Sequence, residues 1–200
     1  MLSDSVWNSN LLLQFSAIGF IGTSVPDLTD ALAKGFVTHI VGKPFVTSDV
    51  GLLGTGTGNG NGVGLTVASP LISSSIYASM LTKGFSGSQL LSTCQAIGLA
   101  CNITLLLATL TSTHTLISGT GTVIPLTIGV SASGMSSDIQ NSTTILVGDK
   151  FPDFCDAVAE GLVNAIITTA IGSVSITPNP PTATPGSPGT GTETGLGVIT

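Results

Sequence analysis

Charged side chains are scarce in this sequence. Only 7% of its 200 residues are Asp, Glu, Lys or Arg, where a soluble domain usually has about 25%. The 4 Lys and Arg form no basic stripe and the net charge is −6, so no nucleic-acid partner is expected. A surface with so little charge is hard to keep soluble when it is fully exposed. The composition therefore favours a protein whose surface is covered largely by neighbouring chains.

Side chains that catalyse reactions are also few. The two histidines, His39 and His114, stand without an accompanying set of acidic partners or a nucleophile, as a metal site or general base would require. The glycine-rich stretch 54–64 lacks the GK[ST] ending of a phosphate-binding Walker A loop. We therefore predict that the chain is not an enzyme, with no catalytic residue, no cofactor, no metal site and no small-molecule substrate.

Two pairs of aspartates allow two interpretations. Asp27 and Asp30, like Asp153 and Asp156, are spaced i, i+3 in the first turn of an expected helix. There they complement the positive end of the helix dipole. A cation site is the alternative, but calcium loops carry a denser set of oxygen ligands.

Cysteine is represented by three residues, Cys94, Cys101 and Cys155. An odd number without a CxxC spacing predicts neither a disulfide framework nor a zinc site. We interpret them as small buried thiols that fill the core.

High apolarity raises the possibility of a membrane protein, because the mean hydropathy is +0.59. The most apolar stretch, residues 96–110, contains Asn102 and is shorter than the roughly 20 residues that span a bilayer. The first 15 residues lack the basic start of a secretory signal. No membrane partner is expected, although a membrane-associated or pore-forming protein remains an alternative.

An internal repeat is the strongest pattern in the chain. Residues 22–35 (GTSVPDLTDALAKG) and 148–161 (GDKFPDFCDAVAEG) are identical at seven of fourteen positions. A middle copy is more diverged: GFIG at 19–22 matches GFSG at 84–87, and GTGT at 54–57 falls at the same offset as GTGT at 119–122. These matches predict three units, at residues 1–67, 68–130 and 131–200, that bury their apolar faces against one another within one compact domain.

Each unit shows the same order of local signals. Two segments with helical apolar spacing come first, and Ser69-Pro70 predicts an N-cap and a proline at the first helical position of the second unit. A Thr-rich stretch, a glycine loop and a short apolar close follow, which favours strands. The predicted fold class is thus α+β, mainly α: three helix–helix–strand–Gly loop–strand units packed through their helices. The third unit adds an extended Pro/Gly/Thr-rich C-terminal arm.

Small residues recur beside the apolar row of each second helix. Alanine and glycine four residues apart let helices approach closely, and a helical glycine that costs about 1 kcal/mol of propensity indicates a packing role. Cys94 and Cys155 share one repeat position, which Thr29 occupies in the first unit. The predicted packing residues are Ala31, Gly35, Ala96, Ala100, Ala157, Gly161, Cys94 and Cys155.

The repeat plan, the few charges and the GTGT loops closing in GVIT at residues 197–200 together resemble virion structural proteins of large tailed bacteriophages. The resemblance implies a non-enzymatic virion component of the neck, tail, baseplate or capsid. Its partners would be copies of itself and other virion proteins, and its location the virion. The alternatives are a membrane-associated or pore-forming protein and a cell-surface or filament subunit.

Overall fold

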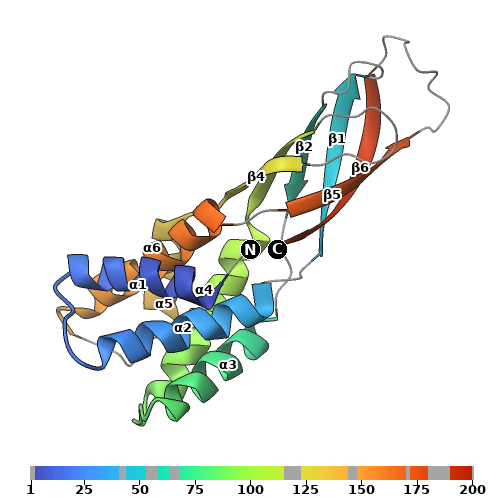
Figure 1. The fold of residues 1–200 in the computed structure, drawn as a ribbon. Helices are drawn as coiled ribbons and strands as arrows, with labels where there is room; N and C mark the ends of the chain where they lie inside the picture. Colours follow the sequence, from blue (N-terminus) through green and yellow to red (C-terminus); the bar gives the residue numbers. More distant parts are fainter. Residues whose placement is uncertain are drawn as a thin grey trace.

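In the part of the chain that the structure describes, six helices lie together at one end and six strands extend away from them (Figure 1). The helices are α1 (Asp4–Ala17), α2 (Val25–Ile40), α3 (Ser69–Thr82), α4 (Leu90–Leu106), α5 (Ala132–Ser142) and α6 (Phe151–Thr169). The strands are β1 (Pro44–Leu52), β2 (Gly58–Val63), β3 (Thr109–His114), β4 (Val123–Gly129), β5 (Gly172–Asn179) and β6 (Thr190–Ile199).

The computed structural model describes the backbone of residues 3–40, 44–52, 58–63, 68–114, 123–143, 148–169, 172–179 and 190–199. Within these, side chains are described for residues 3–40, 68–108, 130–143 and 148–167. The GTGT loops at 54–57 and 119–122, the residues 180–189 of the predicted C-terminal arm and the predicted unit boundary at residue 67 lie outside the described residues.

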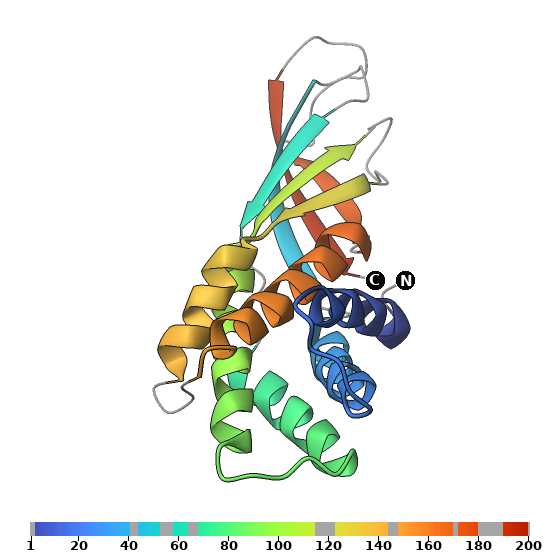
Figure 2. The same ribbon diagram turned by 90° about the vertical axis from the view of Figure 1, so that its left-hand side faces the viewer.

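The helices form a closed ring. Each one packs against the helix before it and the helix after it in the chain, and α6 packs against α1. Figure 2 shows this closure, with α1 (dark blue) beside α6 (orange). The first helices α1, α3 and α5 therefore alternate around the ring with the second helices α2, α4 and α6, and each second helix lies between two first helices.

The first helices turn equivalent apolar rows toward the core. Each row has the spacing i, i+4, i+8, which places its members on one face of a helix. All members are buried: Trp7, Leu11 and Phe15 in α1, Ile72, Ile76 and Met80 in α3, and Met135, Ile139 and the adjoining Thr143 in α5. All of them except Thr143 belong, with the apolar rows of the second helices, to a single hydrophobic cluster.

The same turn ends α1 and α3. Gly19 and Gly84 have φ of 73° and 82°, in the left-handed region where glycine avoids the clash of a Cβ atom. The residue after each glycine hydrogen-bonds back to the last turn of the helix. Phe20 N–H donates to the Phe15 carbonyl at 2.9 Å, and Phe85 N–H donates to the Met80 carbonyl at 3.0 Å. The start of α3 differs by one residue from the prediction, since its N-cap is Ala68 rather than Ser69.

The strands form one antiparallel sheet in the order β4-β3-β2-β1-β6-β5. Consecutive strands of each unit pair as hairpins, and the units are joined through β2 with β3 and through β6 with β1. The two edge strands, β4 and β5, also contact one another. The strands thus follow the same cyclic order as the helices below them.

The predicted fold class, α+β and mainly α with strands in each packed unit, is wrong for the part of the structure in which side chains are described. That part is all-α: it consists of six helices and their immediate ends, contains no strand or sheet, and holds every described buried side chain. The physical reason lies in the sequence of the strands. Segments such as GNGNGV in β2 and TLTSTH in β3 contain few large apolar residues and pair through backbone hydrogen bonds. The described hydrophobic core is formed by the helices.

Candidate functional site

The contact surfaces between helices are the most distinctive site of the described residues. Each second helix carries small residues at three alternate positions: Ala-Leu-Ala-Lys-Gly at 31–35, Ala-Ile-Gly-Leu-Ala at 96–100 and Ala-Val-Ala-Glu-Gly at 157–161. Successive alternate positions point to different sides of a helix. Small residues therefore lie on both sides of each second helix, where its two neighbouring first helices pack.

One of these sides meets the first helix of the next unit. A Cβ atom on Gly35 of α2 would lie 2.9 Å from the Ile76 nitrogen of α3, and one on Gly161 of α6 would lie 3.0 Å from the Leu11 Cα of α1. Leu11 and Ile76 occupy the same place in their apolar rows. The same close approach is thus used at the joint between the first and second units and at the joint that closes the ring.

The other side meets the first helix of the same unit. A Cβ atom on Gly98 of α4 would lie 2.9 Å from the Ser69 carbonyl oxygen and 3.0 Å from the Ser73 nitrogen of α3. Gly98 aligns in the repeat with Ala33 and Ala159, both fully buried. Helix α3 is therefore held closely on two sides, by Gly35 of α2 and by Gly98 of α4.

All eight residues that the sequence analysis selected for packing lie in the helix core. Gly35 and Gly161 form the contacts above, and the other six are at most 3% exposed: Ala31, Ala96, Ala100, Ala157, Cys94 and Cys155. Sequence reasoning missed Gly98. The sequence signal for Gly98 is that its repeat position holds a small residue in all three units, as Ala33, Gly98 and Ala159.

The three cysteines are free and buried. Burial raises the pKa of the Cys94 thiol to about 11, and burial together with the neighbouring Asp156 carboxylate raises that of Cys155 to about 12. Burial also raises the pKa of Cys101. Thr29, at the same repeat position as Cys94 and Cys155, is equally buried and donates to the Val25 carbonyl at 3.2 Å. The position thus takes a small side chain whether or not it is a thiol.

We expect the native protein to resist alkylation by iodoacetamide at pH 8, because the thiolate is the reactive form and all three thiols are buried and protonated. In denaturant all three should be labelled, as counted by mass spectrometry of the intact chain. Labelling of one thiol in the native protein at the rate of a free cysteine would contradict this assignment.

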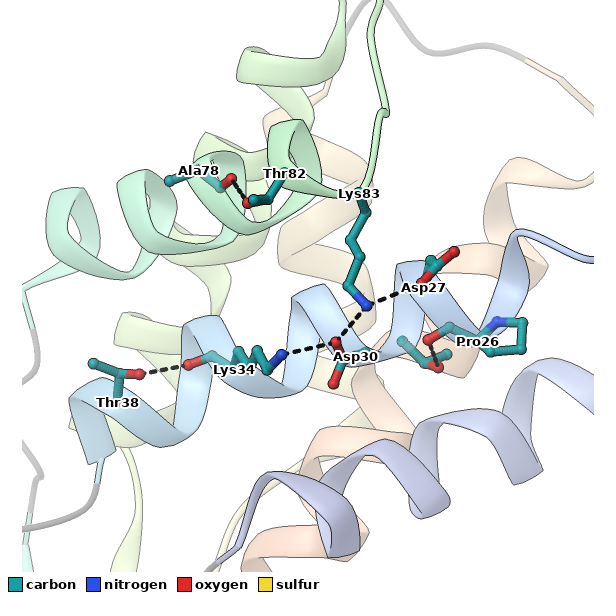
Figure 3. A network of polar contacts seen from close by, with 9 residues as sticks. Pro26, Asp27, Asp30, Lys34, Thr38, Ala78, Thr82 and Lys83 are labelled. Atoms are coloured by element: carbon teal, nitrogen blue, oxygen red, sulfur yellow. Dashed lines mark hydrogen bonds and ion pairs between the residues drawn. The ribbon is translucent and has the colours of Figure 1, made fainter.

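A network of ion pairs connects the first and second units (Figure 3). Lys83, which directly follows α3, places its Nζ 2.9 Å from both Asp27 Oδ1 and Asp30 Oδ2 of α2. Lys34 Nζ lies 3.0 Å from the same Asp30 oxygen. The hydrogen bond from Lys83 lowers the pKa of Asp30, burial opposes this effect, and Lys34 adds to the lowering. The hydrogen bonds to Asp30 and Asp27 raise the pKa of Lys83.

Replacing Lys83 with methionine is expected to reduce stability at pH 7 by a modest amount, since these groups are partly exposed. An aspartate with a lowered folded pKa stabilises above its ordinary pKa of about 4, and this contribution is lost as the pH falls through the folded value. The difference between wild type and Lys83→Met should therefore shrink below about pH 4. Urea denaturation at several pH values measures it.

Lys150→Met is the matched control. Lys150 directly precedes α6 and pairs at 2.9 Å with Asp153 in the first turn of that helix, so its loss should leave the joint between the first and second units unchanged. An equal effect of the two substitutions, or a Lys83→Met effect that persists unchanged at pH 2, would refute a joint held by these charges.

The other polar side chains that could suggest a catalytic or metal site also form contacts between helices. His39 Nε2 lies 2.7 Å from Ser75 Oγ, which links α2 to α3. Ser136 of α5 donates a short hydrogen bond to Asp156 of α6. His114 lies in β3, where side chains are not described. Among the described residues no group of three or more His, Cys, Asp or Glu side chains is placed to hold a metal ion.

A half-open hollow lies between α4 and α5. It has a volume of about 310 Å³ and is lined by Thr104, Leu107, Val130, Ser131, Gly134 and Asp138. Its wall is mostly apolar and contains one carboxylate, so no set of polar groups converges on a bound molecule as in a typical ligand site.

None of the described helices combines the length and the apolar character needed to cross a membrane. Comparison with protein-family models, with curated proteins and with solved structures gives no match to this chain.

Proposed function

We propose that this chain is a non-enzymatic structural subunit of a bacteriophage virion, in the neck, tail, baseplate or capsid, that assembles with copies of itself and with other virion proteins. The observation that carries the proposal is the surface. It has few charges, and ten large apolar side chains of the described residues are exposed. A monomer that stays alone in solution would leave this apolar surface in contact with water.

The construction of the helix ring supports the same role. Close backbone contacts at Gly35, Gly98 and Gly161 leave little room for the helices to slide. A body with fixed helix positions presents a constant outer surface, which repeated contacts in an assembly require. The strands extend beyond this body (Figure 1) and add further surface for neighbours. The resemblance in composition and repeat plan to virion proteins of large tailed phages supplies the virion assignment.

Mass spectrometry of purified particles tests the proposal. The chain should remain with the particles through a density gradient, at a copy number that is a multiple of the symmetry of one particle region. A phage protein made early in infection and absent from particles serves as the control for carry-over. Recovery of the chain only from the soluble fraction of infected cells would refute the virion role.

A further inference from the structure

Charge is distributed unequally among the three repeat units. All ten acidic residues fall in residues 1–67 and 131–200, and none in residues 68–130. The single Lys or Arg of the second unit is Lys83, which is bound to Asp27 and Asp30 of the first unit. Ten large apolar side chains are exposed among the described residues, and six of them belong to this unit: Leu71, Leu81, Leu91, Leu99, Leu106 and Leu107.

The outward stripes of the second helices show this difference position by position. In α2 the stripe reads Pro26, Asp30 and Lys34, and in α6 it reads Pro152, Asp156 and Glu160. In α4 the same repeat positions hold Leu91, Gln95 and Leu99, and Leu106 continues the stripe. These three leucines are 46%, 41% and 45% exposed. Asp30 and Asp156 contact the neighbouring segments through Lys83 and Ser136. The equivalent places of the three helices in the ring give no such reason for exposed leucine on the α4 face alone.

We infer that the outer face of α4, formed by Leu91, Gln95, Leu99 and Leu106, binds the same face of a second copy of the chain. The net charge is −6, and most of it lies in the third unit, which holds six of the ten acidic residues and one lysine, so two copies that meet through this unit repel each other. The α4 face contains no charge, so it meets its own copy without repulsion. In a twofold contact each surface faces itself, and an apolar stripe that runs about 22 Å along a helix suits antiparallel helix pairing.

This inference rests on the proposed function in that it names the face through which copies of the subunit associate. A virion assembly that used the α6 face, with Asp156 and Glu160, would require a counter-charge from another chain, whereas the α4 face requires none. Gln95 adds a polar amide to the stripe, which can hydrogen-bond across the contact.

Sedimentation velocity of the full chain tests the contact. The wild type should form a dimer at micromolar concentration. The double variant Gln95→Asp, Leu99→Glu gives α4 the residues that α6 carries at the same exposed positions, so the ring should fold normally by circular dichroism. It brings like charges together across the twofold axis, and we expect the dissociation constant to rise about 100-fold or more.

Lys34→Gln is the control, because it changes the equivalent position of α2 and should leave the dimer intact. A dimer that survives in the α4 double variant overturns the inference. So does a wild type that remains monomeric at about 100 µM, including the case in which it floats with neutral phospholipid vesicles instead. The particle assay tests where the chain assembles and this experiment tests which face it uses, so either can fail alone.

Discussion

Replacing Gly35 with valine is expected to destabilise the folded chain by about 3 kcal/mol or more. A Cβ atom at this position would lie 2.9 Å from the backbone nitrogen of Ile76 and 3.0 Å from its Cα. A side chain can rotate away from such contact, but backbone atoms move only if α2 and α3 separate. Because a domain is stable by about 5–15 kcal/mol in total, urea denaturation should show a large fall in the midpoint.

Gly22→Val is the matched control, since nothing lies within 4 Å of a Cβ atom placed there. It should change the midpoint little. Gly35→Ala gives a graded measurement if the valine variant does not fold, because its methyl group meets the same backbone atoms while it regains up to about 1 kcal/mol of helix propensity. Equal stability of Gly35→Val and Gly22→Val would show that α2 and α3 are not in close backbone contact at Gly35.

Phe36→Ala is expected to cost about 3–5 kcal/mol, as is usual when a buried phenylalanine is truncated in a packed core. Phe36 is fully buried, and its ring stacks against Trp7 with 6.3 Å between centroids, joining α2 to α1. Trp7 is the one tryptophan of the chain, so its fluorescence reports both the loss of stability and any entry of water at this contact. We expect a lower urea midpoint and red-shifted emission in the folded baseline.

Leu13→Ala provides the comparison within α1, because Leu13 is 64% exposed. Its effect should remain within about 0.5 kcal/mol, as for most surface substitutions. A Phe36→Ala variant with wild-type stability and unshifted emission would mean that the α1–α2 contact does not enclose the tryptophan.

The packing residues could be selected from sequence because the internal repeat shows which residue types occupy one position in all three units. Ala31, Ala96 and Ala157 stay small in three otherwise different contexts, and a helical glycine such as Gly35 carries a propensity cost that packing must offset. The fold class was harder to derive. Thr and Val indicate strands through local preference, but that preference does not say whether the strands contribute to the core, and the described core is helical.

Contacts between distant parts of the chain left no local signal. Asp27 and Asp30 fit the start of a helix, and nothing near them in sequence indicates that Lys83 binds both. The sequence does not reveal the exposed apolar face of α4 either. A helix whose buried and exposed sides are both apolar shows no clear periodicity, so Leu99 reads as a core residue until its exposure is seen.

Closure of the ring has a consequence for the order of the units. Since α6 packs on α1 and β6 pairs with β1, the joint between the last and first units is made by the same kinds of contact as the joint between the first and second. The two chain ends lie close together beside it (Figure 1). The architecture is that of a cyclic trimer joined into one polypeptide, in which the covalent links set the sequence of the units but the packing has no first member.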